Sequence, residues 1–212
     1  MSDDSAGGAS GLAALRGASP RDAATMVWRK FVHRQVEMGR YGVPTAESVG
    51  PDEPCELTLD VWGPDRFDEI LGTNPHLAAD DVRDFRAQRS QVIVVLDGDR
   101  VAASSWMTGG RVFVHELQRH LEVPDDEHFS CRSYVDPDYR GLSLMSHMIH
   151  TYSRRQPAGD EVWGLVYDWN VASVRSLERI GWRRSGDYWT TWWFGRQQGG
   201  ERRYPARPAT TI

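Results

Sequence analysis

Two segments of this chain place residues that bind anions at the point where a predicted strand leads into a predicted helix. The first, residues 135–145 (VDPDYRGLSLM), follows a strand predicted over 129–135, and its helix begins at Gly141. The second, residues 170–182 (NVASVRSLERIGW), follows a strand predicted over 162–167. The N-terminus of a helix carries unpaired backbone N–H groups and about half a positive charge. Each segment therefore predicts a site for a phosphate or a pyrophosphate.

In this order, the two segments resemble the acetyl-CoA-binding core of the GNAT N-acetyltransferase superfamily, over roughly residues 91–194. Members carry the pattern V-x-P-x-x-R-G-x-G-x-G/A after one strand and N-x-x-S/A-x-x-x-Y-x-x-x-G-F after another. The resemblance implies acetyl-CoA, or a related acyl-CoA, as co-substrate. The matching residues here are Val135, Pro137, Arg140 and Gly141 in the first pattern, and Asn170, Ser173 and Gly181 in the second, where Trp182 replaces the usual Phe.

Three positions depart from the family patterns. Ser143 stands where members carry glycine, and Met145 where they carry glycine or alanine, small residues that let the backbone close on the pyrophosphate. The hydroxyl of Ser143 could bind a phosphate, whereas the Met145 side chain either packs in the core or narrows the anion pocket. Leu177 replaces a tyrosine that often serves as the general acid, so a proton donor has to lie elsewhere.

The resemblance implies contacts to the acyl donor along both segments. Backbone amides of 140–145 would hold the pyrophosphate, and the backbone of Val135 would bind the pantetheine arm. A strand bulge near Tyr134 and Val135 would free an amide to polarise the thioester carbonyl. Asn170 and Ser173 cap the second helix, contact the donor, or do both. The donor-binding residues expected on this basis are Tyr134, Val135, Arg140, Gly141, Leu142, Ser143, Leu144, Met145, Asn170 and Ser173.

Acyl transfer to an amine also needs a base for the amine and an acid for the departing thiolate. The strand 128–134 (HFSCRSY) carries no carboxylate, although family members often have a glutamate there. Tyr134 and Tyr167 flank the expected site and could protonate the thiolate, or could be core aromatics. A chain of water molecules could replace a protein base. The candidate bases, each of which could instead be a surface or structural group, are Glu116, His115, Glu127 and Asp168.

Cys131 and the histidines offer other chemistry. Transfer through a Cys131 thiolate would need an activating base beside it, so a small buried hydrophobe on a strand is the better interpretation. His147 and His150 lie three residues apart on one predicted helix, but no third ligand accompanies them, and we expect no metal. Cys55 and Cys131 are expected to be reduced thiols rather than a disulfide.

Composition bounds the class of protein and its partners. The chain has 212 residues and a formal net charge of −5, without a basic stripe, so we expect no nucleic-acid binding. It lacks an apolar run long enough to span a membrane and lacks a signal-peptide pattern, which together predict a cytoplasmic protein. Most of the tryptophans should be core. Because neighbours on a strand point to opposite faces, Trp192 or Trp193 would line the acceptor cleft or form a homodimer contact.

The rest of the chain supplies the elements that must position these groups. Apolar periodicity predicts a helix over 19–38, then a loop over 39–54, and alternation predicts a strand over 55–62. A Gly-containing turn predicts a hairpin over 91–107. The remaining predictions are short helices over 65–71 and 79–88, a strand over 111–117, a helical turn over 117–121, helices over 142–155 and 171–180, and a last hairpin of 182–184 with 188–194.

The order of these elements predicts a mixed α/β fold with helices on both faces of the sheet. The family resemblance adds that the sheet is mostly antiparallel, and that its two central parallel strands splay apart. The gap between 133–135 and 166–168 would leave unpaired backbone groups for the pantetheine arm.

We expect one GNAT-like domain over 19–195. Its region 19–90 would shape the acceptor side, and 91–195 would form the acyl-CoA core. Residues 1–18 are rich in Gly, Ala, Ser and Asp and are expected to be disordered, and 196–212 are expected to form a loose tail.

Together these features predict a GNAT-type N-acyltransferase that passes an acetyl or other short acyl group from acyl-CoA to a primary amine of a small molecule. Direct attack within a ternary complex is the expected mechanism. Antibiotic, metabolite and protein N-terminal amines all remain open as acceptors. One alternative is a thioester-binding module without turnover, favoured by Leu177 and Met145. Another is an enzyme whose donor is a longer acyl group or a carrier-protein thioester.

Overall fold

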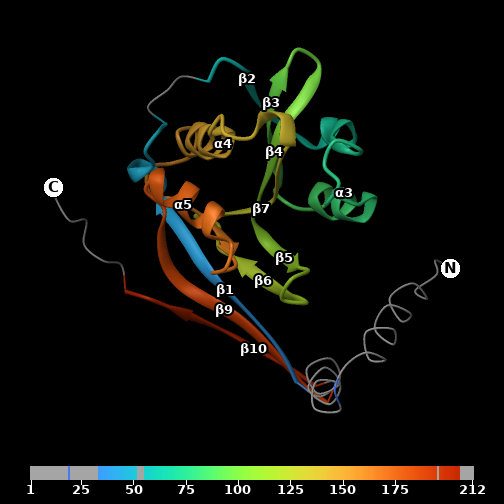
Figure 1. Cartoon of the computed structure of the whole chain (residues 1–212), viewed down its shortest axis with the longest axis vertical. Coiled ribbons are helices and arrows are strands. Elements are labelled where there is room, and N and C mark those ends of the chain that lie inside the picture. The colour runs from blue at the N-terminus through green and yellow to red at the C-terminus, as the bar shows by residue number, and fades with distance from the viewer. Residues whose placement is uncertain (1–18, 20–32, 52–54, 195, 206–212) are drawn as a thin grey trace. The chain divides into compact units, whose positions relative to one another are not determined.

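The structure, a computed structural model, describes residues 19, 33–51, 55–194 and 196–205 (Figure 1). The chain divides into two compact units, one of Met1–Glu37 with Trp189–Gly200 and the other of Met38–Tyr188 with Glu201–Ile212. The second unit contains all the residues expected to bind the donor or to transfer protons. No helix in the described part of the chain is both long and apolar enough to cross a membrane.

Within the described residues, eight strands form one sheet in the order β10-β9-β1-β8-β7-β4-β3-β2, and β5 pairs with β6 in a separate hairpin. The strands of the sheet are β1 (His33–Pro44), β2 (Thr58–Trp62), β3 (Gln91–Asp97), β4 (Arg100–Thr108), β7 (Glu127–Val135), β8 (Glu161–Val166), β9 (Arg183–Trp193) and β10 (Arg196–Arg203). The hairpin is β5 (Gly110–Val114) with β6 (Arg119–Val123). The helices are α3 (Ala79–Arg86), α4 (Leu144–Ser153) and α5 (Val171–Arg179), with 3-10 turns η2 (Thr45–Glu47), η3 (Pro64–Ile70) and η4 (Pro137–Tyr139).

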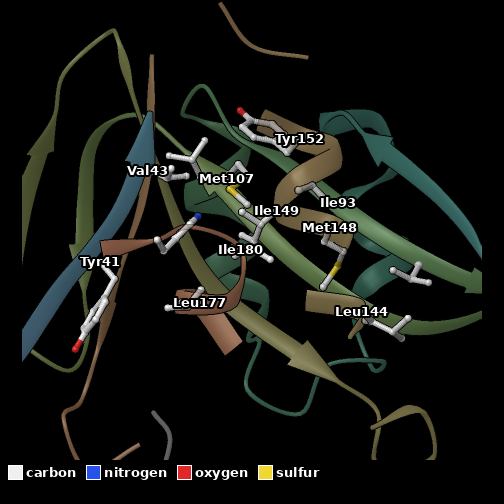
Figure 2. Close-up of a cluster of buried hydrophobic side chains, with 14 of the residues drawn as sticks. Tyr41, Val43, Ile93, Met107, Leu144, Met148, Ile149, Tyr152, Leu177 and Ile180 are labelled. Atoms are coloured by element: carbon white, nitrogen blue, oxygen red, sulfur yellow. The ribbon is translucent and has the colours of Figure 1, made fainter. Parts of the chain in front are cut away.

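Hydrophobic clusters cover both faces of the sheet, because successive side chains of a strand point to opposite faces. On β3, Ile93 and Val95 belong to the cluster that includes residues of α4 and α5 (Figure 2). Val92 and Val94 belong to the cluster that includes residues of α3 and η3. Strands β7 and β8 are parallel, whereas β1–β8, β2–β3, β3–β4 and β4–β7 are antiparallel. The predicted mixed α/β fold with helices on both faces is confirmed.

Strands β7 and β8 pair over the first four residues of each strand alone. Their parallel register runs from Glu127, beside Glu161, to Ser130, beside Gly164. Beyond this point β7 continues to Val135 and β8 to Val166 without pairing to each other. The two central strands therefore separate toward their C-terminal ends, which confirms the predicted splay.

The described part of the N-terminal region is a strand and not the predicted helix. Residues 33–44 form β1, so the helix prediction is wrong over 33–38 and the loop prediction is wrong over 39–44. The remainder of that helix, apart from residue 19, lies outside the described residues, as does the predicted disorder of 1–18.

Pairing with β8 explains why β1 is extended. The antiparallel register runs from Gly39, beside Val166, to Pro44, beside Glu161. A Cβ atom on Gly42 would come within 2.7 Å of the Cβ of Trp163, so the two strands approach closely at this glycine. Pairing with a strand distant in sequence therefore makes 39–44 extended, where the sequence predicted a loop.

Two other segments also differ from prediction because they pair with strands. Residues 119–123, expected to include a helical turn, form β6 opposite β5. Residues 196–203, expected to belong to a loose tail, form β10, and 206–212 lie outside the described residues. The other predicted elements from 55 to 180 are present, with boundaries that differ by a few residues.

The predicted hairpin near the C-terminus is wrong, since β9 runs unbroken from Arg183 to Trp193. Gly186, taken from the sequence as a turn residue, lies within this strand. A Cβ atom there would collide with the carbonyl oxygen of Arg202. The glycine thus permits a close approach of two backbones rather than a turn.

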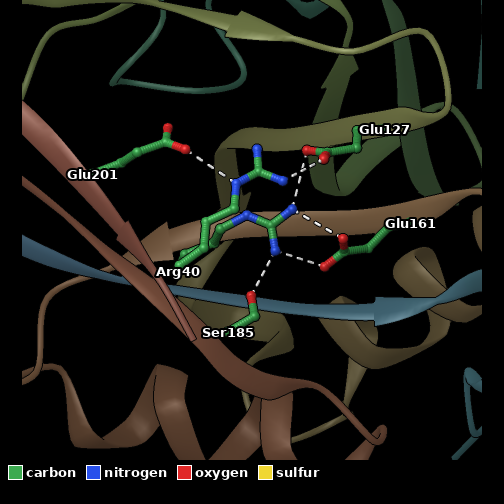
Figure 3. A network of polar contacts seen from close by, with 6 residues as sticks. Arg40, Glu127, Glu161, Ser185 and Glu201 are labelled. Carbon is green, nitrogen blue, oxygen red and sulfur yellow. Dashed lines mark hydrogen bonds and ion pairs between the residues drawn. The ribbon is translucent and has the colours of Figure 1, made fainter. Parts of the chain in front are cut away.

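A buried ion-pair cluster joins strands that are far apart in the sequence (Figure 3). The Arg40 guanidinium donates to Glu161 at 2.7 Å, to Glu127 at 3.0 Å and to the Ser185 hydroxyl at 2.5 Å. Arg203 donates to the other carboxylate oxygen of Glu127 at 2.9 Å. Because Glu127 and Glu161 begin β7 and β8, this cluster lies at the paired end of the two strands, opposite the splay.

Candidate functional site

Charged side chains hold the turn that follows β7. The Asp136 carboxylate accepts a hydrogen bond from the backbone N–H of Asp138 at 3.0 Å. Arg100 donates to Asp136 at 2.8 Å and to Asp138 at 2.9 Å. The Asp138 N–H and then the Arg100 guanidinium lower the pKa of Asp136. The carboxylate therefore stays charged at neutral pH. These bonds fix the direction in which the chain leaves the turn toward Gly141.

Two residues in the left-handed region lead into α4. Gly141 has φ +91° and Ser143 has φ +52°, and glycine adopts such angles without steric cost. Helix α4 begins at Leu144, three residues after the predicted start, and its first hydrogen bond runs from the His147 N–H to the Ser143 carbonyl at 3.1 Å. The amides of 144–146 consequently have no partner within the helix and are available to an anion.

The second segment begins α5 with a side-chain cap. The side-chain oxygen of Asn170 accepts a hydrogen bond from the backbone N–H of Ser173 at 3.3 Å. The capping role predicted for Asn170 is confirmed. A contact between Asn170 or Ser173 and the donor stays a prediction. Both residues lie beside the first segment, where such a contact could form.

A cavity of about 600 Å³ lies where β7 and β8 separate. It is called the larger cavity below. Its wall combines the end of β7, the turn into α4, the end of β8 and the first turns of α5. The structure brings together around it these residues predicted to bind the donor or to transfer protons: Glu116, Val135, Arg140, Gly141, Ser143, Leu144, Met145, Tyr167, Asn170 and Ser173.

Tyr134 and Leu142 lie outside the wall of the larger cavity. Tyr134 stands opposite Ser104 in the β4–β7 pair, and its ring lies edge-on to His76 with the ring centroids 6.3 Å apart. Leu142 is 54% exposed. Of the two tyrosines considered as proton donors, the structure therefore places Tyr167 at the cavity and Tyr134 beside it.

The candidate bases fall into two groups. Glu127 belongs to the ion-pair cluster at the opposite end of β7, and Asp168 pairs with Arg184 at 3.1 Å. Neither carboxylate lines the larger cavity. Glu116 does line it, and His115 lies nearby with its ring 3.3 Å from a carboxylate oxygen of Asp81. The geometry thus favours Glu116 and His115 over the other two.

A smaller cavity, of about 110 Å³, adjoins the larger one. The remaining walls of this smaller cavity combine acidic groups such as Asp81 and Asp84 with aromatic rings such as Phe85 and Phe113. One reactant in the larger cavity and another in the smaller cavity would meet at the residues that the two walls share. Those shared residues are Met38, Glu116, Ser130, Cys131, Arg132 and Leu165.

Strand β7 bulges between the two cavities. Arg132 has φ +48°, and the register of β7 against β4 shifts between Ser104 and Trp106. A bulge leaves an extra residue outside the regular ladder and can free a backbone donor. The bulge predicted near 134–135 is therefore present but lies earlier in the strand, where the two cavities meet.

Side chains that the sequence analysis missed hold this bulge. The buried Asn74 donates from its side-chain amide to the Arg132 carbonyl at 3.0 Å. The Arg132 guanidinium donates to Asp81 at 3.1 Å and lies 3.9 Å from Glu116. No local pattern marks Asn74, because its partner lies 58 positions away in the chain.

Cys131 and Leu177 line the larger cavity without offering an acid or a nucleophile. Burial raises the pKa of the Cys131 thiol to about 12, so the thiol is protonated at neutral pH. Its packing against the cluster on the α3 side supports the prediction of a small hydrophobe. Leu177 is buried in the cluster on the α4 side. Among the described residues, no group of three or more His, Cys, Asp or Glu side chains could hold a metal ion.

Met145 packs against the cluster on the α4 side and also lines the larger cavity. We expect Met145→Ala to lower the free energy of unfolding by about 1–3 kcal/mol, since the side chain is only partly buried. Acetyl-CoA affinity should change by less than about threefold, because the amide rather than the side chain would meet the anion. Urea denaturation and calorimetric titration measure the two effects.

Met148 provides the matched control for this experiment. It is fully buried on the same helix and does not line the cavity, so Met148→Ala should cost more, about 2–5 kcal/mol. If Met145→Ala instead tightened acetyl-CoA binding by tenfold or so, the side chain would be crowding the pyrophosphate.

Several solved structures of other proteins align with the structure of this chain. No family model matches the sequence, and no curated protein matches it. A functionally unknown conserved protein from Staphylococcus epidermidis aligns with a TM-score of 0.54 and 8% identity, over 82% of this chain and 67% of that chain. A GCN5-related N-acetyltransferase from Kribbella flavida aligns with a TM-score of 0.49 and 13% identity, over 79% of this chain and 62% of the other. A tandem GNAT protein from the clavulanic acid biosynthesis pathway aligns with a TM-score of 0.48 and 14% identity, over 87% and 59%.

The chain spans less than two thirds of the length of the two GNAT proteins. The architecture of this chain itself carries the features that the sequence analysis expected. The sheet is mixed, its parallel pair separates, and a strand–turn–helix connection follows each of the two separating strands. These are the features of the sheet and its connections that the sequence analysis predicted.

Proposed function

We propose that this chain is a GNAT-type N-acyltransferase that transfers an acetyl or other short acyl group from acyl-CoA to a primary amine of a small molecule. The observation that carries the proposal is the larger cavity at the β7–β8 splay, whose wall contains the N-terminal residues of both α4 and α5. Such a cavity combines anion-binding amides with unpaired strand backbone. An acyl-CoA, with its pyrophosphate and its amide-containing pantetheine arm, needs both.

The donor would be held along the first segment. The amides of 144–146, together with the left-handed turn at Gly141 and Ser143, would hold the pyrophosphate at the mouth of the larger cavity. The pantetheine arm would lie between the separated strands and hydrogen-bond to backbone groups near Val135, which β8 leaves unpaired. In this arrangement the thioester would lie toward the point of separation, between Ser133 and Ser130.

The acceptor would enter through the smaller cavity. Among the described residues of its wall, three carboxylates, Asp81, Asp84 and Glu116, outnumber one arginine, Arg132, and so favour a positively charged amine. Its aromatic rings favour an apolar body next to the amino group. Glu116 lines both cavities and is the carboxylate that we assign as base for the ammonium group. Removing one proton from the ammonium group yields the neutral amine that attacks the thioester.

Direct attack in a ternary complex follows from the two adjoining cavities, since no protein nucleophile is required between them. A backbone N–H at the Arg132 bulge would stabilise the oxyanion that forms on the thioester carbonyl. The departing thiolate then needs a proton. Leu177 cannot supply it. Of the two tyrosines in the described wall of the larger cavity, Tyr139 already donates its hydroxyl to Asp97 at 2.7 Å, so Tyr167 is the one that could.

Binding of acetyl-CoA tests the donor assignment. Acetyl-CoA at a hundred times its Kd should stabilise the native protein by about 2.7 kcal/mol and so raise the melting temperature. Mass spectrometry should then detect acetylated product when tyramine, spermidine or an amino acid amide is added. No thermal shift with acetyl-CoA, propionyl-CoA or free CoA would contradict the assignment and favour a carrier-protein donor. A shift without any acetylated amine would favour the thioester-binding module.

A further inference from the structure

Three serine hydroxyls form a continuous chain at the point where the two cavities meet. The Ser105 hydroxyl lies 2.8 Å from the Ser133 hydroxyl and 3.2 Å from the Ser130 hydroxyl. The shorter distance is typical of a hydrogen bond between hydroxyls, and the longer one is a long hydrogen bond. A hydroxyl can donate one hydrogen bond while it accepts another. The chain therefore has the connectivity that proton transfer from one end to the other requires.

The bulge in β7 is the reason that Ser130 and Ser133 reach the same partner. Residues three apart on a regular strand point to opposite faces. In the β4–β7 register, Cys131 stands opposite Trp106 and Tyr134 opposite Ser104, so that Arg132 and Ser133 together face the single residue Ser105. The extra residue resets the alternation and turns the Ser133 hydroxyl to the side of the sheet that Ser130 occupies.

The three serines connect the acceptor side to the donor side. Ser130 contributes to the walls of both cavities, whereas Ser133 contributes to the larger cavity alone. Ser105 lines neither cavity and is 0% exposed. The middle of the chain is thus closed to water, and its two ends face the places assigned to the amine and to the thioester.

Other hydroxyl groups near the splay are less suitable donors to the sulfur. Leu177 has no proton to give at the position where a tyrosine would stand. Tyr139 donates its hydroxyl to Asp97 at 2.7 Å. Tyr167 follows the last residue of β8, beyond the point of separation, and its ring stacks on the exposed Trp169 with the centroids 5.1 Å apart.

On the basis of the proposed function, we propose that Ser130, Ser105 and Ser133 relay a proton from the attacking amine to the departing sulfur. When the neutral amine attacks, the C–N bond forms and the nitrogen becomes positively charged. As the C–S bond breaks, its electron pair stays on sulfur. Ser133 gives its proton to sulfur and takes one from Ser105, Ser105 takes one from Ser130, and Ser130 takes the surplus proton from nitrogen.

Every hydroxyl regains a proton in this step, so the products are an amide and a thiol, and no outside acid or base is consumed. Glu116 removes the earlier proton, from the ammonium group before attack, and the relay moves the later one. Ser130 and Ser133 would contact the reacting atoms, whereas Ser105 acts through them as a positioning residue.

Ser105→Ala breaks the relay in the middle without altering either cavity wall. Single-turnover acetylation should be measured with acetyl-CoA and whichever of tyramine, spermidine or an amino acid amide the wild type acetylates fastest. We expect the rate to fall by roughly 100-fold, within the range of general acid–base catalysis. The Kd for acetyl-CoA should stay within about twofold of wild type, because an interaction made in the transition state alone does not affect donor binding.

Ser104→Ala is the matched control. Ser104 adjoins Ser105 on β4 and is equally buried, and its hydroxyl has no hydrogen-bond partner. The rate of this variant should stay within about twofold of wild type. Rates in mixtures of H2O and D2O supply a second readout: several protons moving together give a curved dependence on deuterium content in the wild type, and the dependence should lose its curvature in Ser105→Ala. If Ser105→Ala does not fold, Ser133→Ala replaces it, because Ser133 is exposed.

Equal single-turnover rates for Ser105→Ala and wild type would overturn the relay and leave the acyltransferase function intact. A loss of rate in Tyr167→Phe, with Ser105→Ala at the wild-type level, would assign the proton donor to Tyr167 and also overturn it. A wild-type protein that binds acetyl-CoA but acetylates none of the three amines would overturn the relay together with the proposed function.

Discussion

Replacing Arg40 with methionine is expected to lower the free energy of unfolding by about 3–5 kcal/mol, because it removes one partner from a buried ion-pair cluster. The Arg40 side chain is 2% exposed and donates to Glu161 at 2.7 Å and to Glu127 at 3.0 Å. Its guanidinium also lies 4.5 Å from the centroid of the Trp163 ring. After the change Glu127 keeps the ion pair with Arg203, whereas Glu161 loses the cation beside it.

Urea denaturation measures the loss, and Arg83→Met is the matched control. Arg83 also pairs with a carboxylate, Asp80 at 3.1 Å, but its side chain is 72% exposed. Water and salt screen such a pair, so its removal should change stability by less than about 1 kcal/mol. Adding Glu161→Gln to Arg40→Met should recover part of the loss by removing the uncompensated charge. Equal losses for the two arginine variants would show that the cluster gives no stability beyond that of a surface pair.

Replacing Gly141 with proline is expected to abolish the thermal stabilisation by acetyl-CoA. Proline fixes φ near −65°, whereas Gly141 has φ +91°, so the turn into α4 cannot keep its shape. Proline also removes one backbone amide from the anion-binding segment. Each hydrogen bond to a charged group contributes about 1.5–3 kcal/mol. Losing the Gly141 amide and displacing one of the amides of 144–146 through the altered turn would therefore weaken binding by on the order of 100-fold or more.

Gly72→Pro separates this effect from general destabilisation. Gly72 has φ +88°, and a Cβ atom on either glycine would meet no heavy atom within 4 Å, so the two changes impose a similar strain. Gly72 lines neither cavity. Its proline variant should melt at a lower temperature yet still gain the full shift from acetyl-CoA. A Gly141→Pro protein that keeps the wild-type shift would place the pyrophosphate somewhere other than this segment.

The anion-binding segments could be predicted because their geometry depends on residues close together in the chain. Gly141 marks a left-handed turn through its own φ preference, and Asn170 caps α5 through an amide three residues later. Asp136 caps its turn through an amide two residues later. Most of the donor-binding residues expected from these local signals do line the larger cavity. Backbone preference and capping act over a few residues, and therefore a sequence alone can display them.

Contacts between residues far apart in the chain decided the parts of the fold that differ from the prediction. The apolar spacing of 19–38 fits a helix, but pairing with other strands makes 33–38 part of β1. Gly186 lies in a Ser-Gly-Asp sequence that is typical of a turn. Its backbone instead packs closely against Arg202 of β10, and the residue lies within β9. The local pattern and the tertiary contact disagree in both cases, and the contact determines the structure because strand pairing satisfies the whole backbone of the segment.

The site divides in the same way. By itself the sequence determined the fold class and the strand–turn–helix segments that would bind an acyl donor. Only the tertiary structure showed that Asn74 holds the bulge at Arg132 and that this bulge brings Ser133 beside Ser105. Serine is common on strands and has no local signature of function. The role proposed for Ser133 depends on a one-residue change of register against a strand about 25 positions earlier, and register is set by the packed sheet as a whole.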